Sequence, residues 1–162
     1  MCSICGQKND KSNDHKSLKH NFKSFNEAKI WAKKHIVGTY RNEDTGNDIY
    51  IAKNAIDKYL SASAVLKSVD KDVHLSALMV LPRLIEISVL SASQQDRNND
   101  YHIKEIQRFY GTIRYENVIF PVKITVKVIQ NEGNKAYSYE VMKIENPAEH
   151  EAPQDLPVPS GQ

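Results

Sequence analysis

Cysteine is scarce in this sequence: only Cys2 and Cys5 occur among 162 residues. Two cysteines at one end of a chain cannot form a disulfide framework for a core, so nothing favours an oxidising compartment. Long apolar runs are also missing. No stretch approaches the roughly 18 consecutive apolar residues of a membrane span, and no apolar segment resembling a signal peptide follows Met1. We therefore expect a cytoplasmic protein without a membrane partner.

Several catalytic motifs are absent as well. The sequence has no Gly-rich phosphate loop, no Gly-x-Ser-x-Gly elbow, no His-Glu-x-x-His and no cysteine after residue 5. These absences disfavour nucleotide hydrolases, serine hydrolases, zincins and cysteine enzymes. We expect no cofactor.

The charge is unevenly distributed although the net charge is only +2. Residues 1–41 contain nine Lys or Arg against three acidic residues, whereas residues 145–162 contain four acidic residues and no Lys or Arg. A basic front end favours contact with a polyanion, but on charge alone a solvated tail is the commoner explanation.

The patterning predicts one α+β domain over residues 24–145 between two tails. Residues 1–23 are polar and aperiodic, so we expect a mobile basic arm, and the Pro-rich acidic residues 146–162 are expected to be disordered. Ser24 and Glu27 form a capping box for a first helix that Gly38 ends. A hairpin (residues 39–41 and 48–51) and a helix (54–60) follow. A helical pattern over residues 73–92 is interrupted by Pro82, where the helix kinks or two helices meet.

Residues 109–145 show strand periodicity in three consecutive runs. Residues 120, 122, 124, 126 and 128 are apolar, and Lys123, Thr125 and Lys127 alternate with them. The pattern predicts an antiparallel meander that packs helices on one face and leaves the other face open. Tyr139 and Val141 are expected on the core side, opposite Glu140 and Met142.

The open face is the predicted working surface. Six side chains are expected on it: Tyr110, Arg114, Lys123, Thr125, Lys127 and Ser138. Cations and hydroxyl groups at such positions can bind phosphate, and a tyrosine can stack on a base. An ordinary solvated sheet face shows the same residue types.

His74 is the residue that suggests catalysis. It begins the long helical pattern close to Lys67 and Lys71, and neighbouring cations would keep an imidazole neutral and available as a base. The alternative is a half-buried histidine at a helix start. If His74 is the base, His74→Ala should abolish cleavage and leave the melting temperature nearly unchanged.

A zinc site is a weaker hypothesis. Cys2, Cys5, His15 and His20 resemble a ligand series, but only nine residues, all polar except Gly6, separate the two pairs, where about twelve are usual in a zinc finger. We expect no bound metal.

Residues 49–144 resemble the large polyvalent protein-associated domains of phage and conjugative-element proteins, which look related to the barnase/EndoU/colicin/RelE group of nucleases. The similar stretches are Lys67-Ser68, His74-Leu-Ser-Ala-Leu78, Leu81-Pro-Arg-Leu-Ile85, Arg108-Phe-Tyr-Gly111, Phe120-Pro-Val-Lys-Ile-Thr-Val-Lys127 and Tyr137-Ser-Tyr139. The resemblance implies N-terminal helices and an antiparallel sheet of about four strands.

The same resemblance implies metal-independent RNA cleavage. The matching positions would be His74 as base, Lys67 and Arg114 as phosphate-binding cations, and Thr125 as hydrogen-bond donor. Lys123, Lys127, Tyr110 and Ser138 would then bind substrate. Two hypotheses stay open: a ribonuclease-like or RNA-binding domain of a mobile element, and a non-catalytic module of the same fold that docks a protein by strand addition.

Overall fold

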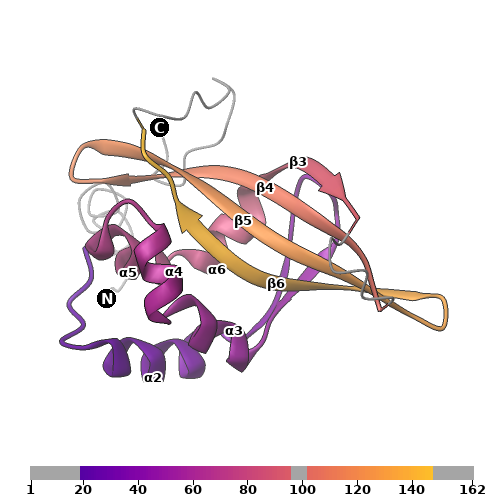
Figure 1. The fold of residues 1–162 in the computed structure, drawn as a ribbon, viewed down its shortest axis with the longest axis horizontal. Helices are drawn as coiled ribbons and strands as arrows, with labels where there is room; N and C mark the ends of the chain where they lie inside the picture. The colour runs from indigo at the N-terminus through magenta and orange to yellow at the C-terminus, as the bar shows by residue number, and fades with distance from the viewer. Residues whose placement is uncertain (1–18, 96–101, 148–162) are drawn as a thin grey trace, which may run out of the picture.

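The computed structural model describes residues 19–95 and 102–147. This part of the chain forms a curved sheet with the helices gathered on one side of it (Figure 1). The helices are α2 (Phe25–His35), α3 (Lys53–Tyr59), α4 (Ala62–Lys67), α5 (Lys71–Leu78) and α6 (Leu81–Ile87); the strands are β1 (Gly38–Arg41), β2 (Asp48–Ile51), β3 (Val89–Gln94), β4 (Ile103–Tyr115), β5 (Val118–Asn131) and β6 (Asn134–Ile144). The predicted α+β class is confirmed.

The sheet is larger than expected. It contains six strands in the order β1-β2-β6-β5-β4-β3, and β2 pairs with β6 in parallel while every other pair is antiparallel. The expectation of about four antiparallel strands was wrong for two reasons. The early β1–β2 hairpin joins the late strand β6, and residues 89–94 form a strand where a helix was predicted.

The predicted helix over residues 73–92 is divided. Helix α5 ends at Leu78, and Pro82 lies in the first turn of α6, where its missing N–H costs no hydrogen bond. Ser88 then leaves the helical conformation (φ −68°, ψ 155°) and β3 begins. No helix in the described part of the chain is long and apolar enough to cross a membrane.

The meander of residues 109–145 is confirmed as β4, β5 and β6. Positive φ angles at Glu116 (49°) and Asn117 (67°) make the tight turn between β4 and β5, and Glu132 (51°) and Gly133 (85°) make the turn between β5 and β6. The core side carries Phe109, Ile113, Val122, Ile124 and Val126, which pack against apolar residues of the helices.

A β-bulge at Glu140 reverses which face of the sheet the following side chains of β6 point to. Thr125 pairs with Val141 and Val126 pairs with Tyr139, so Glu140 is an extra residue on one strand. Beyond the bulge, Met142 is buried in the core and Val141 takes the open side. The predicted facing was therefore wrong for these two residues, because a local insertion reverses the period-two pattern.

The second half of β6 is bordered by the connection between α4 and α5 instead of a strand. β2 pairs with β6 only at Tyr137 and Ser138. Further along, the Val69 amide donates to the Ile144 carbonyl (3.1 Å), and the Ile144 amide donates to the Ser68 hydroxyl (3.1 Å). This connection holds the end of α4 beside β6.

Asn42 links the β1–β2 turn to the end of α6. The buried side chain donates to the carbonyl groups of Ile85 (2.7 Å) and Ser88 (2.9 Å) and accepts from the amide and hydroxyl of Thr45. The amide of Leu90 at the start of β3 donates to Asp44 (3.0 Å) in the same turn. The hairpin at one end of the strand order is thereby fastened to the strand at the other end.

Candidate functional site

His74 lies in the core, fully buried. Its ring stacks on the ring of Tyr59, with centroids 3.8 Å apart and planes inclined by 10°. Nε2 lies 2.8 Å from the Tyr59 carbonyl oxygen, and Nδ1 lies 2.6 Å from the Ser68 hydroxyl. Both ring nitrogens are thus occupied by the protein itself.

The hydrogen-bond partners fix the tautomer of His74. A carbonyl oxygen can only accept, so Nε2 carries the proton and donates to Tyr59. Nδ1 then accepts from the Ser68 hydroxyl, whose oxygen in turn accepts from the Ile144 amide. The expectation that His74 is a base within reach of RNA is not met in this arrangement, because no solvent-exposed ring atom is left to take a proton from a substrate.

Burial lowers the pKa of His74, and the hydrogen bond to the Tyr59 carbonyl opposes that shift in part. The sequence led us to expect that neighbouring cations would lower the pKa of His74, but they are not among the causes of the shift. The neutral ring suits a structural role, since a charged imidazolium in the core would lose its hydration.

The shift predicts a pH dependence of stability. Above pH 6.5, His74 is neutral in both the folded and the unfolded chain and contributes no slope. Below pH 6.5, the unfolded chain binds a proton that the folded chain does not bind, so the free energy of unfolding should fall by up to about 1.4 kcal/mol per pH unit until the pH reaches the folded-state pKa.

Urea unfolding between pH 7.5 and 5.5 measures this dependence, with His74→Gln as the matched variant. An equal slope in the variant and the wild type would contradict the assignment of the pH dependence to His74.

Four lysines surround a pocket between the helices and the open face of the sheet. Lys58 from α3 and Lys67 from the end of α4 meet Lys123 and Thr125 of β5 and Lys143 of β6 around a volume of about 270 Å³. We call this the lysine pocket; Ser61, Ser63, Ala64, Val141 and Met142 also line it. Lys67, Lys123 and Thr125 were predicted site residues, and the structure brings them together.

The lysines influence one another electrostatically. Burial lowers the pKa of Lys123, and the nearby charges of Lys143, Arg108 and Lys67 lower it further, while Glu145 opposes them. Burial also lowers the pKa of Lys58, aided by Lys127 and Lys67. A pocket whose cations repel one another favours an anionic ligand.

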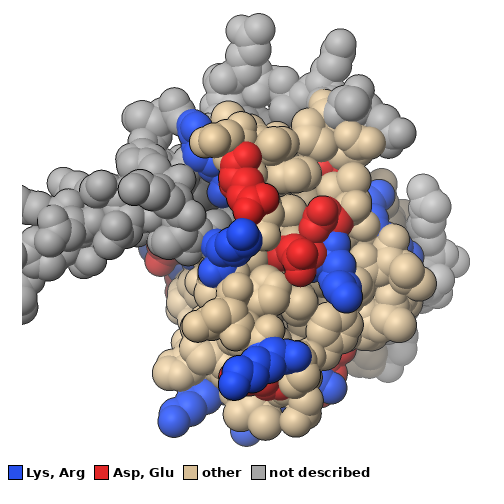
Figure 2. All heavy atoms as spheres, turned by 90° about the vertical axis from the view of Figure 1, so that its left-hand side faces the viewer, with Lys and Arg blue, Asp and Glu red and all other residues tan. Residues whose placement is uncertain are grey.

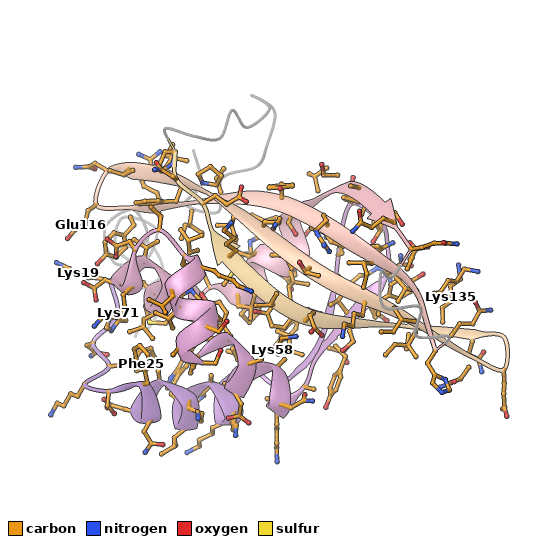
Figure 3. The ribbon with its side chains drawn as sticks, viewed as in Figure 1. Lys19, Phe25, Lys58, Lys71, Glu116 and Lys135 are labelled. Carbon is orange, nitrogen blue, oxygen red and sulfur yellow. The ribbon has the colours of Figure 1, made fainter. Side chains whose placement is uncertain are left out.

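One carboxylate neutralises part of this charge. Glu140 forms ion pairs with both Lys58 and Lys127 (3.3 Å for Lys127), so these two lysines are already engaged. Lys58 lies between α3 and β6 in Figure 3. Within residues 19–95 and 102–147, no carboxylate lies within 4.0 Å of the ammonium groups of Lys67, Lys123 or Lys143. These three cations remain available to an anion.

The other predicted residues lie along the open face. Tyr110 is opposite Lys123, and Ser138 is opposite Lys127. Arg114 is opposite Ile119, four residues along β4 from Tyr110, which corresponds to about 13 Å. A single phosphate in the lysine pocket is therefore out of reach of Arg114, whose predicted partnership with Lys67 and Thr125 is not met.

Arg108 was missed by the sequence analysis. It lies directly opposite Thr125 on the open face, and its Nη1 atom is buried without a hydrogen-bond partner among the described residues. A buried guanidinium nitrogen without a partner is unusual and is satisfied by water or an anion. The sequence could have predicted this position, because Arg108, Tyr110 and Arg114 are separated by even numbers of residues and therefore lie on the same face of β4. Lys58 and Lys143 were also missed.

The zinc hypothesis falls mostly outside the described residues, since Cys2, Cys5 and His15 lie there. His20 is described: its Nδ1 accepts from the Phe22 amide (3.1 Å), and its Nε2 lies 3.5 Å from Asp72. In the part of the chain that the structure covers, no group of three or more His, Cys, Asp or Glu could hold a metal ion.

Charge is mixed at one end of the molecule. Figure 2 shows the end that carries the β4–β5 turn, where basic and acidic side chains alternate without a continuous basic field. At this end, Lys19 pairs with Glu116 (2.8 Å; Figure 3). The lysine pocket differs from this end because Lys67, Lys123 and Lys143 come together around one hollow.

Comparison with known families connects this arrangement to a named group. The model of the family described as large polyvalent protein-associated domain 3 matches residues 19–137, which is most of the chain. The chain belongs to this family. No curated protein and no solved structure matches it. The description of the large polyvalent protein-associated domain 3 family names no reaction, so function has to be argued from the site.

Proposed function

We propose that this large polyvalent protein-associated domain binds the phosphate backbone of RNA at the lysine pocket, without using His74 as a catalytic base. The observation that carries the proposal is the convergence of Lys67, Lys123 and Lys143 with the Thr125 hydroxyl around one pocket. Ammonium groups without carboxylate partners and a nearby hydroxyl are typical phosphate ligands.

The surface next to the pocket supports a polymer rather than an isolated anion. Tyr50, Ser138 and Lys127 form a row across β2, β6 and β5 on the open face, because Tyr50 pairs with Ser138 and Ser138 with Lys127. Tyr50 is 46% exposed. Strands lie about 4.8 Å apart, so Tyr50 and Lys127 are separated by about 10 Å, and a base can stack on Tyr50 while Lys127 stays paired with Glu140.

Cleavage is not part of the proposal. Breaking RNA without a metal requires a base that removes the 2′-hydroxyl proton, and the predicted base is enclosed by Tyr59 and Ser68. Binding is what the described side chains support.

The proposal is tested with a fluorescein-labelled 20-nucleotide single-stranded RNA in buffer containing EDTA. Anisotropy should rise with protein at 50 mM NaCl, and an increase to 200 mM should weaken binding about 20-fold if three phosphates are contacted. The RNA should remain intact on a denaturing gel. Absence of binding at 50 mM NaCl would overturn the proposal, and cleavage that persists in EDTA would overturn its non-catalytic part.

A second candidate is a protein partner that adds a strand to β3. This strand ends the sheet order, and residues 91–94 are exposed. Its edge offers main-chain donors and acceptors to an extended peptide. The two functions differ in salt dependence, because main-chain pairing is far less sensitive to ionic strength than phosphate binding.

A further inference from the structure

The Glu140 carboxylate bridges two lysines from different elements. Lys58 comes from α3 and Lys127 from the open face of β5. One carboxylate oxygen pairs with the ammonium group of Lys58, and the other lies 3.3 Å from the ammonium group of Lys127. We call these three side chains the Glu140 cluster. It contains two cations that a single anionic group already holds.

The carboxylate can leave this cluster without disturbing the sheet. The bulge leaves Glu140 without an opposite residue on β5, and β2 pairs with β6 only up to Ser138, so no strand of the described chain borders β6 at Glu140. The side chain of Lys58 is 52% exposed and that of Lys127 is 33% exposed. Ion pairs between partly exposed groups are weak, so another anion can replace the carboxylate.

A phosphate group suits the same two cations. Lysine ammonium groups bind carboxylate and phosphate oxygens through the same charge-assisted hydrogen bonds. A phosphodiester has two free oxygens and a single negative charge, as a carboxylate does. The exchange of Glu140 for a phosphodiester therefore leaves the charge of the cluster unchanged.

The Glu140 cluster lies between the lysine pocket and the exposed Tyr50. Lys58 also lines the lysine pocket, whereas Lys127 is opposite Ser138, the neighbour of Tyr50. Lys123 and Lys127 are four residues apart on the same face of β5, which corresponds to about 13 Å between their backbone positions. An anion that contacts the whole row carries several phosphates.

We propose that Lys58 and Lys127 form a second phosphate site, for which the Glu140 carboxylate competes with RNA. The inference rests on the proposed function, because the neighbouring phosphate is held in the lysine pocket. RNA anchored there presents its next phosphate at a high local concentration, whereas free phosphate has no such anchor. Glu140 therefore lowers the affinity for RNA and excludes isolated phosphate from the second site.

The second site is tested without RNA, by NMR of the lysine side-chain ammonium groups in the full chain. Added inorganic phosphate, at constant ionic strength, should shift the signals of Lys58 and Lys127 in the Glu140→Gln variant and leave them nearly unchanged in the wild type. Glu132→Gln, at an exposed position of the β5–β6 turn, is the matched control and should behave as the wild type. Unshifted signals in Glu140→Gln would overturn the second site, and equal shifts in the wild type would overturn the competition.

The competition with RNA is tested by anisotropy at 50 mM NaCl. Glu140→Gln should bind the labelled RNA about fivefold more tightly than the wild type, and the dependence of log affinity on log salt should steepen by about 0.7 for one additional phosphate. Glu132→Gln should change the affinity less than about twofold. Equal gains in the two glutamate variants would overturn specific competition.

The two lysines are tested in the Glu140→Gln background. Adding Lys58→Gln and Lys127→Gln should return the affinity to within about twofold of the wild type, since the second site is then lost. Adding Lys34→Gln and Lys53→Gln removes the same charge from exposed positions on the helices and should keep most of the gain. Equal losses from the two lysine pairs would contradict a local site.

The two failures are distinguishable. If phosphate shifts Lys58 and Lys127 in Glu140→Gln but no variant binds RNA, the second anion site stands and the proposed function fails. If every variant binds RNA equally and phosphate shifts neither lysine, the proposed function stands and the second site fails.

Discussion

Replacing His74 by alanine is expected to lower the free energy of unfolding by about 4 kcal/mol or more. The substitution removes a ring stacked on Tyr59 and leaves a cavity in the core. It also deprives the Ser68 hydroxyl of its acceptor and the Tyr59 carbonyl of its donor. Each buried polar group left without a partner adds roughly 1–3 kcal/mol to the cost of the cavity.

This outcome is the opposite of the one expected for a surface base, which would leave the melting temperature nearly unchanged. Chemical denaturation at pH 7.5 measures the difference, with His35→Ala as a control at an exposed helix end. The control should change the free energy of unfolding by less than about 1 kcal/mol. A stable His74→Ala protein with altered RNA handling would show that the ring acts on a ligand rather than on the fold.

Neutralising the lysine pocket is expected to have the largest effect on binding. The triple variant Lys67→Gln, Lys123→Gln, Lys143→Gln should bind single-stranded RNA about 100-fold more weakly at 50 mM NaCl. The reason is the loss of three phosphate contacts at about 1 kcal/mol each, with 1.4 kcal/mol per factor of ten. The dependence of log affinity on log salt should flatten by about 2.

The matched control removes the same charge from the helical side. Lys34, Lys53 and Lys71 are exposed residues of α2, α3 and α5. Their replacement by glutamine should weaken binding less than about threefold, because these side chains do not line the lysine pocket and salt screens exposed charges. Equal losses in the two triple variants would show a general charge effect and no phosphate site.

The local parts of the fold followed from the sequence. The meander could be predicted because strand alternation and tight turns are properties of neighbouring residues, and the register of β4 and β5 keeps Phe109 and Ile113 in the core as expected. The parallel pairing of β2 with β6 and the identity of β3 could not be predicted. Both depend on contacts between segments far apart along the chain.

The site was predictable in part, for a similar reason. The period of β5 placed Lys123 and Thr125 on the open face, but only the α4–α5 connection beside β6 determines which strand positions meet Lys67. The lysine pocket therefore lies nearer to Arg108, which is opposite Thr125, than to Arg114, although both arginines are on the same face of β4. His74 was misjudged because residues 73–78 of α5 are all buried, so after its first two residues this helix has no solvent-facing side that its sequence could reveal.

Because of the bulge in β6, the loss of one residue could change the charge near the lysine pocket without shifting the register of the strand. Without Glu140, Tyr139 and Val141 would follow one another in regular alternation, with the facing that they already have. A relative could therefore lose or gain this single residue and keep the register of the remaining strand. Since the Glu140 carboxylate holds both Lys58 and Lys127, such a deletion would release two cations at once. A one-residue gap at this position in related sequences would mark family members with a more basic surface.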